Sequence, residues 1–275
     1  MIADISVYQG DINWEIARKQ IELAIFRASI ELSPDKKYVQ NATNCKIPYG
    51  VYHFLKASNA DEAAKEAEFF YKTATSNDCK PLFFVADIEY KTQNSSNIES
   101  IAKAFAETLF KLGAQKIGVY IGQYNYPYLR EAVKLYNFIW IPRYGLNDGT
   151  ANTKYQPIYP CDLWQYTSVG HIDGIAGNVD LNVLHGSKTL EWFCEEQKKV
   201  TFNLVSKVIR SGATGVNVKE IQKALNYLGF SCGTADGIYG TKTKAAIIKF
   251  QKQYKLVVDG IYGPKTCAKM KELIG

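Results

Sequence analysis

The chain has 275 residues, of which 47% are hydrophobic and 22% charged, and its formal net charge is +6 at pH 7. This length accommodates one large core or a large domain with a smaller one, and the composition excludes an intrinsically disordered chain. No apolar run approaches the length of a membrane span.

Strand-like and helix-like segments alternate over the first 185 residues. We expect strands at Ile2–Val7, Glu22–Ala28, Tyr49–Phe54, Leu82–Ile88, Lys116–Ile121, Phe138–Arg143, Asp162–Thr167 and Asn178–Val183. We expect helices around Trp14–Gln20, Lys37–Cys45, Asp61–Thr75, Ile98–Leu112 and Tyr124–Leu135. Eight strands with about five helical crossovers predict an α/β fold, an irregular, parallel, TIM-like barrel whose last third lacks helices.

The strand that ends at Ile88 carries two carboxylates near its end. Asp87 and Glu89 are two residues apart, so their side chains share one face of the strand. Burial and mutual repulsion raise the pKa of one of such a pair. A carboxylic acid that keeps its proton near neutral pH is what general-acid cleavage of a glycosidic bond requires. Taken alone, the pair also fits a strand end whose acids are solvated or ion-paired.

Polar faces also run along three other predicted strands. Asp4 lies opposite Ile5 in the first strand, Tyr120 shares its face with two glycines, and Asp180 shares its face with two asparagines. In a closed barrel these faces point inward, where an unpaired acid costs several kcal/mol. We therefore expect Asp4, Asp180 and the pair of carboxylates described above to converge in one functional site.

A series of ordered motifs resembles the signature blocks of glycoside hydrolase family 25. They cover about residues 1–185 and are Asp4-Ile5-Ser6 with Gln9-Gly10 and Ile12-Asn13-Trp14, Phe26-Arg27-Ala28-Ser29, Gly50-Val51-Tyr52-His53-Phe54, Asp87-Ile88-Glu89, Trp140-Ile141-Pro142-Arg143-Tyr144, Leu163-Trp164-Gln165-Tyr166-Thr167 and Gly174-Ile175-Ala176-Gly177-Asn178-Val179-Asp180-Leu181-Asn182. Pro142 stands where the family pattern has a small residue.

The resemblance implies a lysozyme of the N-acetylmuramidase type, which cleaves the β-1,4 bond from N-acetylmuramic acid to N-acetylglucosamine in peptidoglycan without a cofactor or metal. It implies that Glu89 is the general acid. Asp87 would orient or polarise the acetamido group of the substrate or otherwise support the cationic transition state. Asp4 and Asp180 would complete the acidic cluster. Either Asp180 or the substrate's own acetamido group would act as the nucleophile.

Further side chains near these strand ends have more than one interpretation. Five aromatic residues are either sugar-stacking platforms or parts of the core: Tyr52, Phe54, Tyr120, Trp140 and Trp164. Gln165, on the face opposite Trp164, is predicted to hydrogen-bond a sugar hydroxyl. His53 fits a hydrogen-bonded structural histidine better than a catalytic base, and Arg27 fits a structural ion pair as well as a site role.

The C-terminal part of the chain differs in charge and pattern. Residues 201–275 contain twelve Lys or Arg and four Asp or Glu, a net charge of +8, which leaves about −2 for residues 1–200. Two near-identical segments, Asp236–Gly240 and Asp259–Gly263, flank a helical pattern. With Thr243 and Thr266 they resemble the three-helix peptidoglycan-binding domain of the first type. The alternative is a small helical bundle with only a packing role.

We therefore expect a muramidase domain at residues 1–190, a partly packed linker at 191–210 and a small three-helix domain at 211–275. The expected partner is Gram-positive peptidoglycan, with anionic wall polymer attracted by the lysine excess, and neither nucleic acid nor membrane insertion. Met1-Ile2-Ala3-Asp4 opens a strand without a signal peptide. We expect a phage-type or prophage-type endolysin made in the host cytoplasm and released through a membrane lesion, or an autolysin exported by another route.

The sequence disfavours three other classes of protein. A wall-binding protein with an inactive barrel is disfavoured because all four acids are in place. A chitinase is disfavoured because Leu82 and Val85 stand where its D-x-x-D-x-D-x-E motif has acids. An amidase or zinc peptidase is disfavoured because the three histidines lack metal-binding spacing, and the six scattered cysteines fit mostly free thiols.

Overall fold

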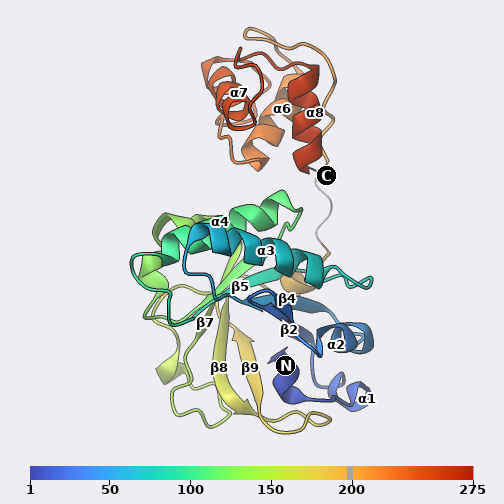
Figure 1. Ribbon diagram of the computed structural model, residues 1–275, viewed down its shortest axis with the longest axis vertical. Helices are drawn as coiled ribbons and strands as arrows, with labels where there is room; N and C mark the ends of the chain where they lie inside the picture. Colours follow the sequence, from blue (N-terminus) through green and yellow to red (C-terminus); the bar gives the residue numbers. More distant parts are fainter. Residues whose placement is uncertain (197–200, 275) are drawn as a thin grey trace. The chain divides into compact units, whose positions relative to one another are not determined.

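The computed structural model describes residues 1–196 and 201–274. The chain divides into two compact units, Met1–Gln197 and Lys198–Gly275, each with its own hydrophobic core (Figure 1). The predicted linker at 191–210 includes residues 197–200, which lie outside the described residues.

The first unit is a closed barrel of eight strands. The strands are β1 (Ile2–Ile5), β2 (Leu23–Ile30), β4 (Tyr49–Phe54), β5 (Phe84–Ile88), β6 (Ile117–Ile121), β7 (Phe138–Pro142), β8 (Leu163–Gly170) and β9 (Val179–Leu184), with the two-residue β3 (Ser33–Pro34) at the edge of β2. Pairing between β1 and β2 closes the barrel. The α/β barrel predicted from the alternating segments is confirmed.

The direction of the last strand differs from the expected parallel arrangement. β1, β2 and β4 to β8 pair in parallel around the barrel, whereas β9 is antiparallel to both β8 and β1. The segment 171–178 that joins β8 to β9 is too short for the crossover that two parallel strands require. The chain therefore turns back directly, and β9 enters the gap in the opposite direction.

The helices of the first unit cover the outside of the barrel. They are α1 (Trp14–Ala17), α2 (Tyr38–Asn44), α3 (Ala60–Ala74) and α4 (Ile98–Lys111), followed by the 3-10 segment η2 (Tyr126–Leu135). α3 begins where the side chain of Asn59 accepts a hydrogen bond from the backbone N–H of Glu62, and it packs beside α4 (Figure 1). The helix predicted around Tyr124–Leu135 is present as the 3-10 segment η2, and Arg130, with a positive φ of 45°, interrupts its helical backbone.

Aromatic side chains fill the barrel interior near the amino-terminal ends of the parallel strands. Gly50 and Gly118 leave space there, because a Cβ atom at these positions would lie 2.1 Å from the ring of Phe83 and 2.2 Å from the ring of Phe138. Phe193, from α5 (Leu190–Cys194), packs against both rings at centroid distances of 5.4 and 5.0 Å. This packing closes one end of the barrel and leaves the carboxyl ends of the parallel strands for the site.

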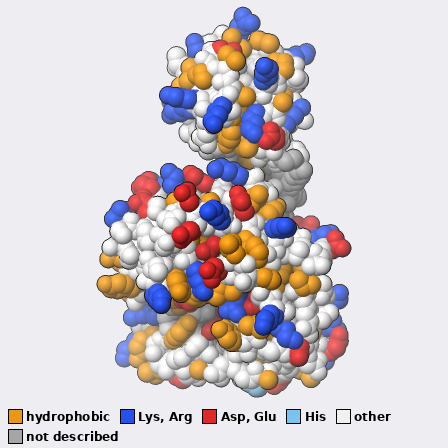
Figure 2. Space-filling view, viewed as in Figure 1, with side chains coloured by type: hydrophobic (Ala, Val, Ile, Leu, Met, Phe, Trp, Pro, Cys, Tyr) orange, Lys and Arg blue, Asp and Glu red, His pale blue; other side chains and the backbone are white. Residues whose placement is uncertain are grey.

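The second unit contains three helices within its described residues, α6 (Val216–Tyr227), α7 (Thr241–Gln253) and α8 (Pro264–Ile274). The two repeated segments form equivalent turns between them. Gln222 donates to Asp236 and to the carbonyl of Ile238, and Gln251 donates to Asp259 and to the carbonyl of Ile261. Lys and Arg side chains are spread over the face of this unit seen in Figure 2. Among the described residues no helix is long and apolar enough to span a membrane, and all six cysteines are free.

Candidate active site

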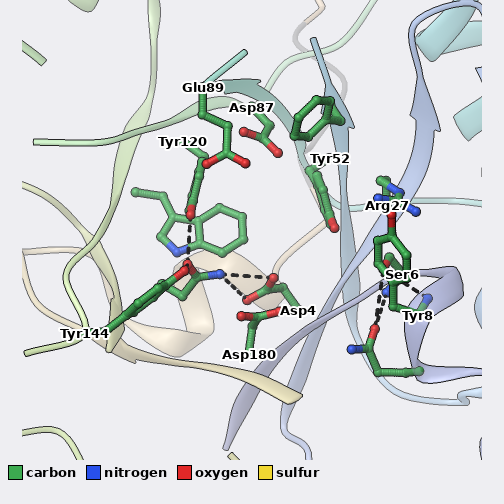
Figure 3. A pocket seen from close by; sticks show the side chains of 14 residues that line it. Asp4, Ser6, Tyr8, Arg27, Tyr52, Asp87, Glu89, Tyr120, Tyr144 and Asp180 are labelled. Carbon is green, nitrogen blue, oxygen red and sulfur yellow. Dashed lines mark hydrogen bonds between the residues drawn. The ribbon is translucent and has the colours of Figure 1, made fainter. Parts of the chain in front are cut away.

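A pocket of about 240 Å³ opens at the carboxyl ends of the parallel strands. Its lining is polar and aromatic, with side chains from strands across the barrel (Figure 3). The lining residues are Asp4, Ser6, Tyr8, Gln9, Arg27, Tyr52, Phe54, Asp87, Glu89, Tyr120, Trp140, Tyr144, Gln165 and Asp180. All four acids predicted to converge are therefore brought together.

Strand register explains why these side chains meet. Asp4 in β1 is the direct partner of Asp180 in β9, and Asp87 in β5 is the direct partner of Tyr120 in β6. Residues paired across a ladder lie on the same face of the sheet. Glu89 follows the last residue of β5 and joins the pocket because it is two positions beyond Asp87.

Asp87 and Glu89 form one side of the acidic cluster (Figure 3). Burial raises the pKa of Asp87 well above its usual value, and the neighbouring Glu89 and Asp4 raise it further. Glu89 lies at the pocket mouth, where the residue as a whole is exposed. The protein around its carboxyl group removes water from it, and this desolvation raises the pKa of the carboxyl. The charge of Asp180 raises it further. Among the described residues, the buried Oδ1 of Asp87 has no hydrogen-bond partner. This oxygen of a pocket-lining carboxyl is thus left unsatisfied by the described residues.

Asp4 is held in a cradle of amide groups. Gln165 Nε2 lies 3.2 and 3.0 Å from the two carboxyl oxygens of Asp4, and Asn182 Nδ2 lies 2.8 Å from Oδ2. These hydrogen bonds favour the charged carboxylate, but burial and the charge of Asp180 outweigh them and raise the pKa of Asp4 to about 8. Burial raises the pKa of Asp180 to about 6. Burial therefore raises the pKa of both members of this cross-strand pair.

The amide of Gln165 is oriented by two phenols. Tyr120 and Tyr144 donate to its Oε1 from 2.8 and 2.7 Å, so its Nε2 must face Asp4. The indole N–H of Trp140 orients Asn182 in the same way, at 2.7 Å from Oδ1. The amide predicted to bind a sugar hydroxyl is therefore engaged within the protein. Gln165 lines the pocket and positions Asp4.

The aromatic residues predicted near the site separate into two groups. Tyr52, Phe54, Tyr120 and Trp140 line the pocket. Trp164 does not, because its side chain points out of the barrel interior, on the face opposite Gln165, and its indole N–H donates to the carbonyl of Arg143 at 2.7 Å. A sugar-stacking role for Trp164 in this pocket is therefore corrected to a packing role.

The predicted structural histidine lies away from the pocket. The ring nitrogens of His53 are 2.8 Å from Ser29 Oγ and 2.8 Å from Glu66 Oε2. Complete burial lowers the pKa of this imidazole. Within residues 1–196 and 201–274, no group of three histidine, cysteine or acidic residues could hold a metal ion.

Several pocket residues were absent from the predicted site. Ser6, Tyr8, Gln9 and Tyr144 line the pocket, and so does Arg27, whose sequence context fits both a structural ion pair and a site role. Ser6 is two residues after Asp4 and so shares its face of the chain. Tyr144 is two residues after Pro142, the last residue of β7. Strand alternation could therefore have identified both. Tyr8 and Gln9 belong to the 3-10 turn η1 (Val7–Gln9), which strand periodicity does not reveal.

The arrangement suits acid-catalysed cleavage of an acetal. A carboxyl with a raised pKa can donate a proton to a leaving oxygen, and neighbouring carboxylates can stabilise the positive charge that develops on the sugar. The aromatic walls offer faces for sugar rings.

Comparisons with known proteins agree with this chemistry. Residues 3–175 match the model of glycosyl hydrolases family 25, and residues 214–270 match that of a putative peptidoglycan binding domain. The chain is 28% identical over 269 residues to the autolytic lysozyme of Clostridium acetobutylicum, covering 93% of this chain and 74% of that protein.

Two solved structures resemble the barrel. A glycosyl hydrolase 25 of Streptococcus pneumoniae is 29% identical with a TM-score of 0.62, covering 69% of this chain and 88% of that one. The catalytic domain of an endolysin from bacteriophage P40 of Listeria monocytogenes is 27% identical with a TM-score of 0.59, covering 67% and 92% of the two chains.

Proposed function

The chain belongs to glycosyl hydrolases family 25, and from this we propose that its barrel cleaves the β-1,4 bond between N-acetylmuramic acid and N-acetylglucosamine. It is a glycosidase of the lysozyme type, a peptidoglycan hydrolase with a peptidoglycan-binding domain. The observation that carries the proposed bond specificity is the convergence of Asp4, Asp87, Glu89 and Asp180 in one pocket of this family's barrel.

In the proposed reaction, Glu89 donates its proton to the glycosidic oxygen as the bond to the anomeric carbon breaks. The raised pKa of this carboxyl supports the role, because the group must be protonated when substrate arrives. The free Oδ1 of Asp87 accepts a hydrogen bond from the acetamido N–H. Water then displaces the nucleophile from the anomeric carbon, and the proton that the water loses restores the acid form of Glu89.

Asp4 and Asp180 support the cationic transition state from the opposite side of the pocket (Figure 3). Asp180, whose pKa of about 6 is the lower of the two, carries negative charge near neutral pH and opposes the positive charge that develops at the anomeric carbon, and Asp4 lies beside it. The nucleophile is either Asp180 or the acetamido oxygen of the substrate, as the family resemblance leaves open. The two alternatives differ in whether a glycosyl–enzyme ester forms on residue 180.

We also propose that the basic second unit anchors the enzyme to the Gram-positive cell wall. The charge of +8 on residues 201–275 supports attraction to anionic wall polymer. Exposed lysines such as Lys242, Lys249 and Lys252 on α7 provide the positive surface.

We propose that the enzyme reaches the wall from the cytoplasm, through a membrane lesion as in phage lysis. The free cysteines and the similarity to a phage endolysin support this route. Expression in the cytoplasm of a Gram-positive host tests the route. Cells should remain intact until their membrane is permeabilised, and lysis without permeabilisation would instead indicate export by another path.

The bond specificity is tested by digesting purified Gram-positive peptidoglycan and reducing the products with borohydride. We expect muramitol, because cleavage at the proposed bond leaves muramic acid at the new reducing end. Glucosaminitol would place the cut at the other glycosidic bond. New amino termini without new reducing ends would contradict a glycosidase.

A further inference from the structure

One positive charge stands among the acids of the pocket. The lining contains four carboxylates and a single cationic side chain, Arg27. Arg27 is only 8% exposed, and it lies across Tyr52 from Asp87 in the close view (Figure 3). Burying a guanidinium costs several kcal/mol unless it is paired, so its position needs a cause.

One edge of Arg27 is held firmly by the protein. Its Nε donates to Asp35 Oδ2 at 2.8 Å. Asp35 is itself immobilised, because its carboxylate also accepts the backbone N–H groups of Val7 at 3.0 Å and Lys37 at 2.9 Å. Within the described part of the chain, this is the only ion pair of Arg27, so none of the pocket carboxylates is its direct partner.

The outer edge of the guanidinium is left for a ligand. No hydrogen bond to a described residue engages Nη1 or Nη2. The ring of Tyr8 lies against the guanidinium, 5.0 Å from Cζ, while 82% of the residue surface of Tyr8 stays exposed at the rim. A planar pair of nitrogens, held in place and partly shielded from water, matches the two oxygens of a carboxylate.

The proposed substrate carries one such group. N-acetylmuramic acid differs from N-acetylglucosamine by a lactyl ether at C3, which ends in a carboxylate or, where a stem peptide is attached, in an amide carbonyl. Burial beside acidic side chains would disfavour a carboxylate here unless a cation received it. We propose that Arg27 binds the lactyl group of the muramic acid unit, and that Tyr8 shields this contact. The inference rests on the function proposed above and explains how the pocket selects the muramic acid side of the bond.

The test compares two forms of the same glycan strands. Strands freed of stem peptides by an amidase carry lactyl carboxylates, and carbodiimide coupling to methylamine converts these to neutral amides. The measured quantity is the ratio of kcat/KM on the two forms. Wild-type enzyme should prefer the carboxylate form. Arg27→Gln should lower kcat/KM on that form by roughly ten- to a hundredfold, the range for a charge-assisted contact, and bring the ratio close to one.

The ratio separates substrate recognition from a purely electrostatic role. If Arg27 acted only on the charge of Asp87, its replacement would reduce activity on both forms equally and leave the ratio unchanged, which would overturn the proposal. Arg18→Gln, on the outside of the barrel in an ion pair with Glu15, is the matched control and should keep the wild-type ratio.

Two further measurements keep the test decisive. Thermal unfolding shows whether Arg27→Gln folds. If that variant does not fold, Arg27→Lys replaces it, because lysine keeps the positive charge but lacks the planar pair of nitrogens. The same ratio of kcat/KM on the two substrate forms is then measured. Wild-type enzyme is first checked for release of muramitol. Its failure to do so would reject the proposed function, whereas muramitol release with an unchanged ratio in the variant would reject only the role of Arg27.

Discussion

Asp4 and Asp180 are direct cross-strand partners in the antiparallel ladder between β1 and β9. This relationship places two carboxylates side by side inside a closed barrel, where burial is the main cause of their raised pKa values, about 8 for Asp4 and about 6 for Asp180. The reversed last strand thus supplies one half of the acidic cluster, and the end of β5 supplies the other.

Replacing Asp180 with asparagine should flatten the dependence of stability on pH. A carboxyl whose pKa is raised by folding contributes stability that is fully present below its unfolded pKa and is lost as pH rises through its folded pKa. For Asp4 this window runs from about 4 to about 8, and for Asp180 it ends at about 6. Asp180→Asn removes the contribution of residue 180 to this dependence on pH. It also lowers the pKa of Asp4, because the neighbouring charge is gone.

Thermal unfolding midpoints measured between pH 4 and pH 8 test this expectation. The midpoint of Asp180→Asn should fall less over this range than that of wild type. Asp173→Asn, at an exposed position beside His171, is the control and should behave as wild type. An equal fall of the midpoint in Asp180→Asn and wild type would mean that folding does not raise the pKa values of this pair.

Replacing Glu89 with glutamine should abolish most of the hydrolysis. General acid catalysis supplies about 10²–10⁴-fold in rate, and glutamine keeps the shape of the side chain without a proton to donate. The measurement is the rate of new reducing ends from purified peptidoglycan, with wall binding followed in parallel. Glu68→Gln, on the exposed face of α3, should retain full activity. Undiminished hydrolysis by Glu89→Gln would contradict the role of Glu89 as the general acid.

The pH–rate profile should keep its alkaline limb above the ordinary range of a glutamic acid. Burial is the larger cause of the raised pKa of Glu89 and the charge of Asp180 the smaller one, so Glu89 stays protonated to higher pH than a free glutamic acid, whose pKa is about 4.3. The four acids titrate together, so the limb reports the cluster. It is measured as kcat/KM on soluble glycan strands. A limb at or below about pH 4.5 would contradict the role given to Glu89.

The acidic cluster was predictable because strand alternation is a local property. Asp87 and Glu89 are two residues apart, and Asp4 and Asp180 each alternate with branched apolar residues, so the inward faces could be identified before the barrel was seen. Their meeting required only that the strands close into a barrel, which the number of strands and helices already indicated.

The hydrogen-bond network around Asp4 was not predictable in the same way. Gln165 was recognised as inward-facing, but its partners come from β1, β6 and the segment after β7, far apart in the sequence. Whether an inward amide meets substrate or protein depends on distances that no local pattern contains. The direction of β9 could have been inferred from the short connection before it, since eight residues cannot form a crossover.

Replacing Gln165 with leucine should cost more stability than replacing Tyr144 with phenylalanine. Leucine removes one of the two amide groups that donate to Asp4, and it leaves the buried phenol of Tyr120 and the partly buried phenol of Tyr144 without their acceptor. Each buried unsatisfied group costs about 1–3 kcal/mol. Tyr144→Phe removes one phenol, while Tyr120 still holds the amide. Urea unfolding of both variants measures the difference. Equal stability of the two variants would show that the network does not position Asp4.

Removing the second unit should weaken wall binding without changing the chemistry. The first unit has its own core, so a protein of residues 1–197 should cleave soluble glycan strands as fast as the full chain. On intact walls it should bind more weakly, because the positive surface of the second unit is gone. Sedimentation with purified walls measures the bound fraction, and equal binding of the two proteins would contradict anchoring.

Salt distinguishes attraction by charge from other contacts of the second unit. The screening length falls from about 10 Å at 0.1 M salt to about 3 Å at 1 M, so binding through lysines should weaken over this range. In the full chain, replacing Lys242, Lys249 and Lys252 with glutamine should lower binding at 0.1 M salt and leave it equal to wild type at 1 M. The helix itself should persist, because all three side chains are exposed on α7. If the variant binds as well as wild type at both salt concentrations, these lysines do not attract the wall. The anchor would then be the other contacts that the domain makes with peptidoglycan.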